Sequence, residues 1–200
     1  MTKLSQSFYT RPDVVQISKE LLGKYLFTQI DGILTGGRIV ETEAYSGEND
    51  LACHSHSGRR TARTEIMYHT GGVAYTYLIY GIYTLFNIIT NQAEYADAVL
   101  IRAIEPTEGF PEMLLRRNHT KVTSRLTAGP GLLTIALGIT TKHYGTNLTG
   151  DLIWLEDRNE PVAEEQIIAS PRVGVAYAGT DALLPWRFRL KNSKWTSPAK

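Results

Sequence analysis

The chain has 200 residues, of which 42% are hydrophobic and 20% charged, a composition that is ordinary for a globular protein with a buried core. Its formal net charge of +1 does not indicate a nucleic-acid partner, and its single cysteine, Cys53, excludes an intrachain disulfide. The N-terminus carries no apolar signal segment, and residues 78–89 are too few and too polar to span a bilayer. We therefore expect a cytoplasmic protein of the bacterial type with no membrane partner.

The first half of the chain contains one predicted helix followed by paired strands. Residues 12–22 have an apolar side and end before a glycine, which is typical of a helix. Tyr25–Ile30 and Ile33–Tyr45 have strand-like composition, and the Asp31-Gly32 pair between them is a hairpin signal. Residues 47–64 are polar, and we expect a loop there.

The second half adds another hairpin and several shorter elements. Residues 73–80 and 83–90 are rich in β-forming residues and are joined around Gly81, so they should pair. A strand over residues 98–104 is expected to end at Pro106. Helices are predicted over residues 107–118 and 131–137, and short strands over 152–155, 166–169 and 186–190.

Clustered strands joined by hairpins favour the α+β class. We expect a single domain over residues 1–200, with a curved, mostly antiparallel sheet surrounded by helices and a protruding β-hairpin.

Glu41, Glu43 and Tyr45 alternate along one predicted strand and therefore project from the same face. Two carboxylates beside an aromatic ring are poor core material, but they suit a pocket that holds a flat ring. A glutamate is ionised at neutral pH and can take a proton from water, so Glu43 is a candidate general base. Alternatively, Glu43 is a solvated residue at a strand edge or a member of an ion pair. For Glu41 we favour a structural ion pair with an arginine.

His54 raises the question of a zinc site, because it follows a cysteine and His56 and His69 lie nearby. The chain has no CxxC or HExxH motif, so the ligand spacing is poor and we predict no metal. A neutral histidine that hydrogen-bonds a ligand or caps a loop is the interpretation we favour for His54.

The tip of the second hairpin is unusually apolar. Hairpin turns are normally polar, but here Tyr80 and Ile82 flank Gly81. One interpretation is a cluster of core tyrosines whose hydroxyls have hydrogen-bond partners. The other is a wedge that enters the minor groove of DNA and unstacks bases. In the second interpretation Tyr77 can stack on a ring in a pocket.

Two polar residues interrupt apolar strands. Asn87 lies in Leu-Phe-Asn-Ile-Ile, where it must be hydrogen-bonded. It either satisfies the backbone at a sheet irregularity or forms a pocket wall that tests the polar edge of a bound base. Arg102 lies in the strand over residues 98–104, where an arginine is usually paired or functional, and Glu41 and Glu43 are candidate partners.

Several segments form a specific pattern when they are taken in order. They are GRIVETEAY at residues 37–45, ACHS at 52–55, YTYLIYG at 75–81, LIRAIEP at 100–106, GPG at 129–131 with ALGI at 136–139, and PRVG at 171–174 with YAG at 177–179. In this order and spacing they resemble the alkyladenine (3-methyladenine) DNA glycosylase family over nearly the whole chain. The resemblance implies an α+β domain with no metal and no organic cofactor.

The resemblance also implies catalytic and base-binding roles. Glu43 matches the base that activates the attacking water, and Arg102 matches an arginine that helps to hold this water. Tyr45, His54 and Tyr77 match the residues that sandwich and hydrogen-bond an extruded purine.

Further matches concern the DNA. Tyr80 matches the intercalating tyrosine, with Ile82 beside it at the tip, and Asn87 matches the residue that clashes with the exocyclic amine of guanine. Arg59 and Arg63 lie in one of three basic stretches without acidic residues and are candidates for contacts to the DNA backbone. Leu132 stands where members of the family often carry a lysine.

The implied function is that of a monofunctional DNA glycosylase in base excision repair. It would excise alkylated or deaminated purines, such as 3-methyladenine, 7-methylguanine, hypoxanthine and ethenoadenine, from double-stranded DNA by base flipping and water attack on the N-glycosidic bond. We expect a monomer that acts at the bacterial nucleoid. The alternatives are a non-catalytic sensor of damaged DNA, which the intact Glu43 disfavours, and a nucleoside N-glycosidase, which the apolar hairpin tip disfavours.

Overall fold

The computed structural model describes residues 2–198, and over this range the protein forms a nine-stranded sheet. The strands are β1 (Thr2–Lys3), β2 (Tyr25–Ile30), β3 (Ile33–Tyr45), β4 (Ala74–Ile79), β5 (Tyr83–Thr90), β6 (Asp97–Glu108), β7 (Ile153–Asp157), β8 (Ile167–Ser170) and β9 (Arg187–Leu190). Their main order is β1-β7-β2-β3-β6-β5-β4, while β9 pairs with β3 and β8 with β9. The pairings are antiparallel.

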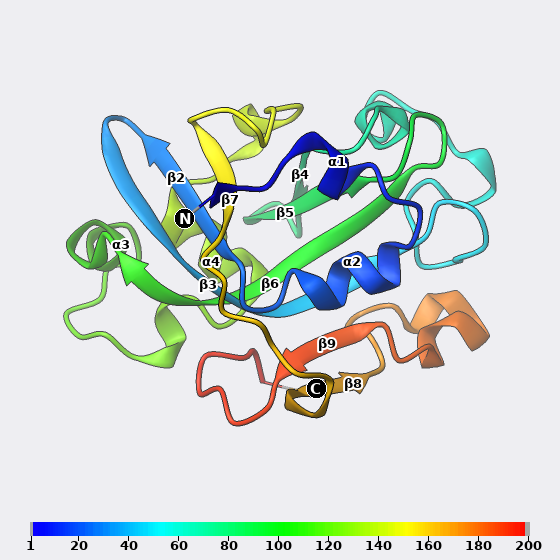
Figure 1. Cartoon of the computed structure of the whole chain (residues 1–200). Coiled ribbons are helices and arrows are strands. Elements are labelled where there is room, and N and C mark those ends of the chain that lie inside the picture. The colour runs from blue at the N-terminus through cyan, green and yellow to red at the C-terminus, as the bar shows by residue number, and fades with distance from the viewer. Residues whose placement is uncertain (1, 199–200) are drawn as a thin grey trace.

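Short helices lie around this sheet. The α-helices are α1 (Gln6–Tyr9), α2 (Val14–Glu20), α3 (Phe110–Arg116) and α4 (Pro130–Leu137). Single turns of 3₁₀-helix cover His56–Gly58, Glu65–Tyr68, Ser124–Leu126, Thr141–His143 and Glu164–Gln166, with a longer kinked one at Ala176–Leu183. Figure 1 shows α2 lying against β3 and β6, and the β8–β9 ribbon beside the main sheet. The predicted α+β class is confirmed.

The elements predicted in the first half of the chain are present, and a helix cap and a tight turn account for their bounds. The helix expected over residues 12–22 is shorter and covers Val14–Glu20. It begins at Val14 because Asp13 caps it by accepting from the backbone N–H of Gln16 at 2.9 Å. The strands β2 and β3 have the predicted bounds. Asp31 and Gly32 between them both have positive φ, of 53° and 77°, as a tight hairpin turn requires.

The strand β6 is longer than predicted. We expected Pro106 to end it and a helix to begin at residue 107, but β6 continues to Glu108 and α3 begins at Phe110. Pro106 pairs with Gly37 of β3 on one side, whereas the pairing of β6 with β5 ends at Leu100. The missing N–H of the proline therefore costs no bond of the β5–β6 ladder.

Alternation gives the central strands two different faces. Phe86 and Ile88 of β5 and Val99 and Ile101 of β6 enter the main hydrophobic core together with α2 and α4. Their neighbours in sequence point to the opposite face, which carries the polar residues singled out above. In the described part of the chain, no helix is long and apolar enough to cross a membrane.

Candidate active site

A row of paired residues crosses four strands on the polar face of the sheet. Tyr75 of β4 pairs with Asn87 of β5, Asn87 with Leu100 of β6, and Leu100 with Glu43 of β3. Directly paired residues project from the same face, so strand pairing gathers side chains that are far apart in sequence. The first three line a cavity of about 800 Å³, and Glu43 lies at the end of the row.

An irregularity in the sheet places Arg102 beside both glutamates. Thr42 pairs with Ile101 and Glu41 with Ala103, so Arg102 between them has no partner on β3. Such a bulge can re-aim a side chain. The Nε atom of Arg102 donates to Glu41 at 2.8 Å, and its Nη1 atom lies 3.3 Å from the Glu43 carboxylate. The predicted ion pairs of Arg102 are therefore confirmed.

Glu43 is fully buried and held from three sides. One carboxylate oxygen accepts from the Tyr45 hydroxyl at 2.8 Å, and the other accepts from the backbone N–H of Val173 at 2.8 Å and faces Arg102. Burial, and then the charge of Glu43, raise the pKa of Tyr45 well above its ordinary value, so its phenol stays protonated and can donate. Glu43 thus lies behind Tyr45 rather than on the cavity wall.

Glu41 is the structural ion-pair residue that its sequence context favoured. It is fully buried, and its carboxylate accepts from Arg102 at 2.8 Å and from Arg187 of β9 at 2.7 Å. Both arginines donate to the same oxygen of Glu41, whereas Glu43 faces one arginine, so the two glutamates of β3 have different surroundings although they lie only two residues apart.

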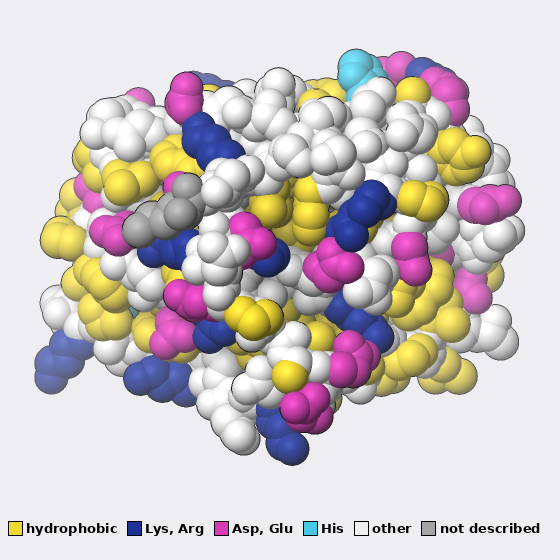
Figure 2. All heavy atoms as spheres, in the orientation of Figure 1, with side chains coloured by type: hydrophobic (Ala, Val, Ile, Leu, Met, Phe, Trp, Pro, Cys, Tyr) yellow, Lys and Arg dark blue, Asp and Glu magenta, His cyan; other side chains and the backbone are white. Residues whose placement is uncertain are grey.

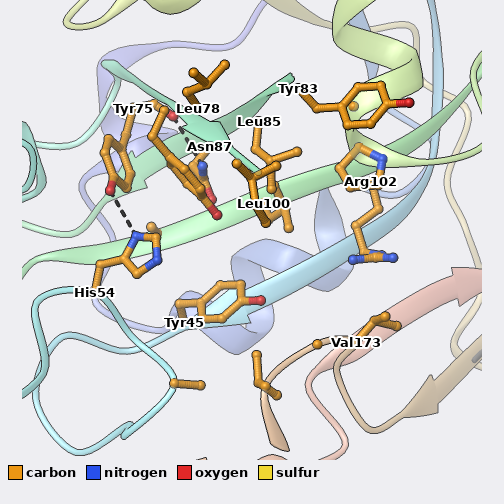
Figure 3. A pocket seen from close by; sticks show the side chains of 18 of the residues that line it. Tyr45, His54, Tyr75, Leu78, Tyr83, Leu85, Asn87, Leu100, Arg102 and Val173 are labelled. Carbon is orange, nitrogen blue, oxygen red and sulfur yellow. Dashed lines mark hydrogen bonds between the residues drawn. The ribbon is translucent and has the colours of Figure 1, made fainter. Parts of the chain in front are cut away.

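Aromatic rings form the walls of the cavity, as Figure 3 shows. The Nδ1 atom of His54 shares a hydrogen bond of 2.9 Å with the Tyr75 hydroxyl, and the imidazole meets the Tyr77 ring edge-on at 4.8 Å. Tyr45 contributes its ring from β3, below His54 and Asn87 in the figure. The guanidinium of Arg63 lies over the Tyr77 ring at 4.6 Å and donates to the Tyr75 hydroxyl.

We expect His54 to stay neutral throughout the physiological pH range. Burial, together with the charges of Arg63 and Arg59, lowers the pKa of His54 to about 4. Because this pKa lies below that of an unfolded histidine, the unfolded chain binds a proton at His54 more readily than the folded protein does. The free energy of unfolding therefore keeps its full value above about pH 6.5 and decreases as the pH falls toward 4.

An NMR titration of the imidazole should therefore show no protonation of His54 above about pH 6. The variant Arg63→Gln should raise its pKa because one of the two nearby cations is removed. A midpoint near the ordinary value of 6.5 in the parental protein would contradict the assignment.

Asn87 satisfies the backbone and also lines the cavity. Its side-chain nitrogen donates to the carbonyl oxygen of Tyr75 at 3.1 Å, and the residue is buried. This bond fixes the orientation of the amide and leaves the side-chain oxygen available to a ligand. Asn87 thus has a backbone partner, as the first sequence interpretation expected, but it lies at a regular point of the sheet and not at an irregularity.

The hairpin tip combines backbone strain with exposed apolar side chains. Tyr80 and Gly81 have φ values of 53° and 69°, and a bond from the Ile82 N–H to the Ile79 carbonyl oxygen closes the turn. A left-handed conformation is easy for glycine but costs a tyrosine on the order of 1 kcal/mol. Tyr80 is 84% exposed and Ile82 70%, so packing within the protein does not offset this cost. Tyr80 also lines the cavity.

The basic stretch before β4 serves several purposes. Arg59 is exposed, Arg60 bridges Glu65 and Glu94 at 2.8 Å each, and Arg63 rests against the cavity wall. On the face drawn in Figure 2, basic and acidic side chains are interspersed. Among the described residues, no three His, Cys, Asp or Glu side chains are grouped so that they could hold a metal ion.

Three residues of the site had no role predicted from the sequence. Tyr75 lies two residues before Tyr77 and follows the same alternation, which was a usable signal. Val173 contributes its backbone N–H, which every residue except proline carries, so its side chain gives no signal. Arg172 stacks on the Tyr45 ring at 4.7 Å, and only its place in the PRVG segment pointed to it. Leu132 also lines the cavity.

Comparison with known proteins agrees with the resemblance seen in the sequence. The family model of methylpurine-DNA glycosylase (MPG) matches residues 7–194. A relative from Bacillus cereus (strain G9842), named "Putative 3-methyladenine DNA glycosylase", is 44% identical over 199 residues, which cover 96% of this chain and 97% of the relative. A relative of the same name from Chlamydia felis (strain Fe/C-56) is 43% identical over 192 residues, with 96% and 97% covered. The chain therefore belongs to the methylpurine-DNA glycosylase family, which comprises DNA-repair hydrolases of N-glycosyl bonds.

Proposed function

We propose that residues 1–200 form one monofunctional glycosylase domain, which acts as a monomer and releases alkylated or deaminated purines from duplex DNA. The observation that carries the proposal is the buried Glu43, held by Tyr45, Val173 and Arg102 at the edge of an aromatic cavity. A cavity of about 800 Å³ lies within the usual size range of small-molecule sites and has room for a purine.

The first step of the proposed reaction is extrusion of the target nucleotide. Arg59 and Arg63 contact the DNA backbone, and Tyr80 with Ile82 enters the minor groove as a wedge. The exposed, strained tip supports this role, because it presents rigid apolar groups next to the cavity mouth. Rotation of the nucleotide out of the stack costs a few kcal/mol, and filling of the vacated space by Tyr80 offsets part of this cost.

The extruded base then stacks between Tyr45 on one side and His54 with Tyr77 on the other. Neutral His54 can exchange a hydrogen bond with the base, since burial keeps it unprotonated. The side chain of Asn87 excludes undamaged guanine, whose exocyclic amine would meet it in the cavity. These contacts favour purines that lack that amine. 7-Methylguanine keeps the amine, but its positive charge favours stacking on Tyr45 and Tyr77 and makes it a better leaving group than guanine.

In the hydrolytic step, the bond between the purine nitrogen and the sugar C1′ breaks, and its electron pair leaves with the base. A water oxygen forms the new bond to C1′, and Glu43 takes the proton of this water while Arg102 helps to hold it. The carboxylate also stabilises the positive charge that develops on the sugar. Because Glu43 is buried behind Tyr45, binding of the base must displace the phenol enough to admit one water.

Substrate competition tests this function. Release of free purine should be observed from duplexes that contain 3-methyladenine, 7-methylguanine, hypoxanthine or ethenoadenine, and excess free nucleoside should compete weakly. Strong competition by nucleosides would favour a nucleoside N-glycosidase, and tight lesion binding without release would favour a sensor of damage.

Replacement of the wedge should weaken extrusion. We expect Tyr80→Ala to bind a lesion duplex roughly tenfold or more weakly, because a base-stacking aromatic side chain contributes about 1–3 kcal/mol. Tyr95→Ala is a suitable control, since Tyr95 is also exposed but lies outside the cavity lining. Fluorescence-anisotropy titration measures the affinity for the lesion duplex. If Tyr80→Ala binds as tightly as the parental protein, Tyr80 does not act as a wedge.

A smaller residue in place of Asn87 should relax the selectivity against guanine. We expect Asn87→Ser to release undamaged guanine from duplex DNA measurably faster than the parental protein does, because the steric conflict with the exocyclic amine is reduced. Chromatography of the released bases measures the effect. If the guanine rate stays at the parental level while lesion release persists, discrimination does not depend on Asn87.

A further inference from the structure

A segment near the C-terminus, which follows β9, folds back onto Glu41. We call residues 195–197 the C-terminal strap. Trp195 is buried in the main core, and Ser197 is 5% exposed. The backbone N–H and the hydroxyl of Ser197 both donate to the Glu41 carboxylate, at 2.5 and 2.7 Å. A segment beyond β9 therefore closes over a buried glutamate of β3.

The strap also holds Arg102. The Nε atom of Arg102 donates to Glu41 at 2.8 Å, and its Nη2 atom donates to the Ser197 hydroxyl at 3.3 Å. Its Nη1 atom lies 3.3 Å from Glu43, which is an ion-pair distance. Arg187 donates to the same hydroxyl at 3.3 Å and to Glu41 at 2.7 Å. Two of the three nitrogens of the Arg102 guanidinium are thus bonded on the side away from Glu43.

We propose that Ser197 is a positioning residue for base release, which keeps Arg102 from pairing fully with Glu43. The proposal rests on the roles proposed above for Glu43 and Arg102. An arginine that binds a carboxylate through two parallel hydrogen bonds strongly favours its charged form, and such a carboxylate is a poor proton acceptor. While the strap holds Arg102, Glu43 keeps acceptor capacity for a water.

The hydroxyl of Ser197 can be removed without a change in backbone or charge. In Ser197→Ala, the Nη2 atom of Arg102 loses its acceptor and Glu41 loses one of its donors, so the guanidinium is free to close onto Glu43. Ser197→Thr keeps the hydroxyl and serves as the rescue variant. Thr196→Val is the matched control, because the Thr196 hydroxyl lies in the same strap but bonds to the Ser193 carbonyl oxygen.

We expect Ser197→Ala to lower the single-turnover rate of base release roughly tenfold to a hundredfold, as loss of a hydrogen bond to charged groups does. Its affinity for the lesion duplex should stay at the parental value. Ser197→Thr and Thr196→Val should retain the parental rate.

A parental rate in Ser197→Ala would overturn the inference. A slower rate that Ser197→Thr does not restore, or one that comes with weaker binding of the lesion duplex, would also overturn it, because general loosening of the fold gives that result. Failure of the proposed function would give a different result from failure of this inference. The parental protein would then release no base, or Glu43→Gln would release it at the parental rate. If the parental protein is active, Glu43→Gln is inactive and Ser197→Ala is unchanged, only the role of the strap is contradicted.

Discussion

Glu43→Gln should bind a lesion duplex with the parental affinity and release its base on the order of 10²- to 10⁴-fold more slowly. Glutamine has nearly the same shape, and its side-chain oxygen can still accept from Tyr45 or Val173. It carries no negative charge and cannot take a proton from water. The loss should therefore appear in the rate of the chemical step and not in binding, and single-turnover kinetics with excess protein would separate the two.

The control for this variant is Glu108→Gln. Glu108 ends the same β6 strand that carries Arg102, but it is exposed and does not line the cavity. It should release base at the parental rate. Equal rates for Glu43→Gln and Glu108→Gln would show that the proton acceptor lies elsewhere.

Asp50→Ala should lower the free energy of unfolding by about 3–5 kcal/mol, which is the usual effect of removing one partner from a buried ion pair. Both carboxylate oxygens of Asp50 accept from Arg172, and the two side chains are 0% exposed. Without Asp50 the guanidinium keeps the carbonyl oxygens of Ala44 and Asp181 as partners, but its charge is left uncompensated. This loss is a large fraction of the stability of an ordinary domain.

Urea unfolding followed by circular dichroism measures the change, and Asp151→Ala is the matched control. The side chain of Asp151 is 98% exposed and pairs with Lys3 at the surface, so its removal should change stability by less than about 1 kcal/mol. Similar midpoints for Asp50→Ala and the parental protein would mean that water reaches Arg172 and replaces its partner.

Asp50→Ala also connects stability to the site. Arg172 stacks on the Tyr45 ring and precedes Val173, whose N–H holds Glu43. Displacement of Arg172 should therefore disturb both the platform for the base and the carboxylate. We expect folded Asp50→Ala protein to release base more slowly than the parental protein does.

Much of the fold follows from local signals. The Asp31-Gly32 turn specified the β2–β3 hairpin to the residue, and alternation placed Glu41 and Glu43 on the face that meets Arg102. The bounds of β6 could not be obtained in this way. Whether Pro106 ends a strand depends on which neighbouring strand is present beside it, and this is a property of the complete sheet.

The site could be predicted only where a side chain carries its own chemical signal. An arginine in an apolar strand requires a partner, so Arg102 pointed to the glutamates. The N–H of Val173 and the hydroxyl of Ser197 are common groups, and their importance comes from long-range contacts with Glu43 and Glu41. The burial of Glu43 behind Tyr45 likewise arises from packing that composition and periodicity do not encode.

The most direct test of the central claim is a single-turnover assay with a duplex that contains one hypoxanthine or 7-methylguanine. The protein, in excess over DNA, should release the free purine and leave an intact strand that breaks only on treatment with alkali, because water is the nucleophile. Absence of free purine, or a strand break without alkali, would contradict the account.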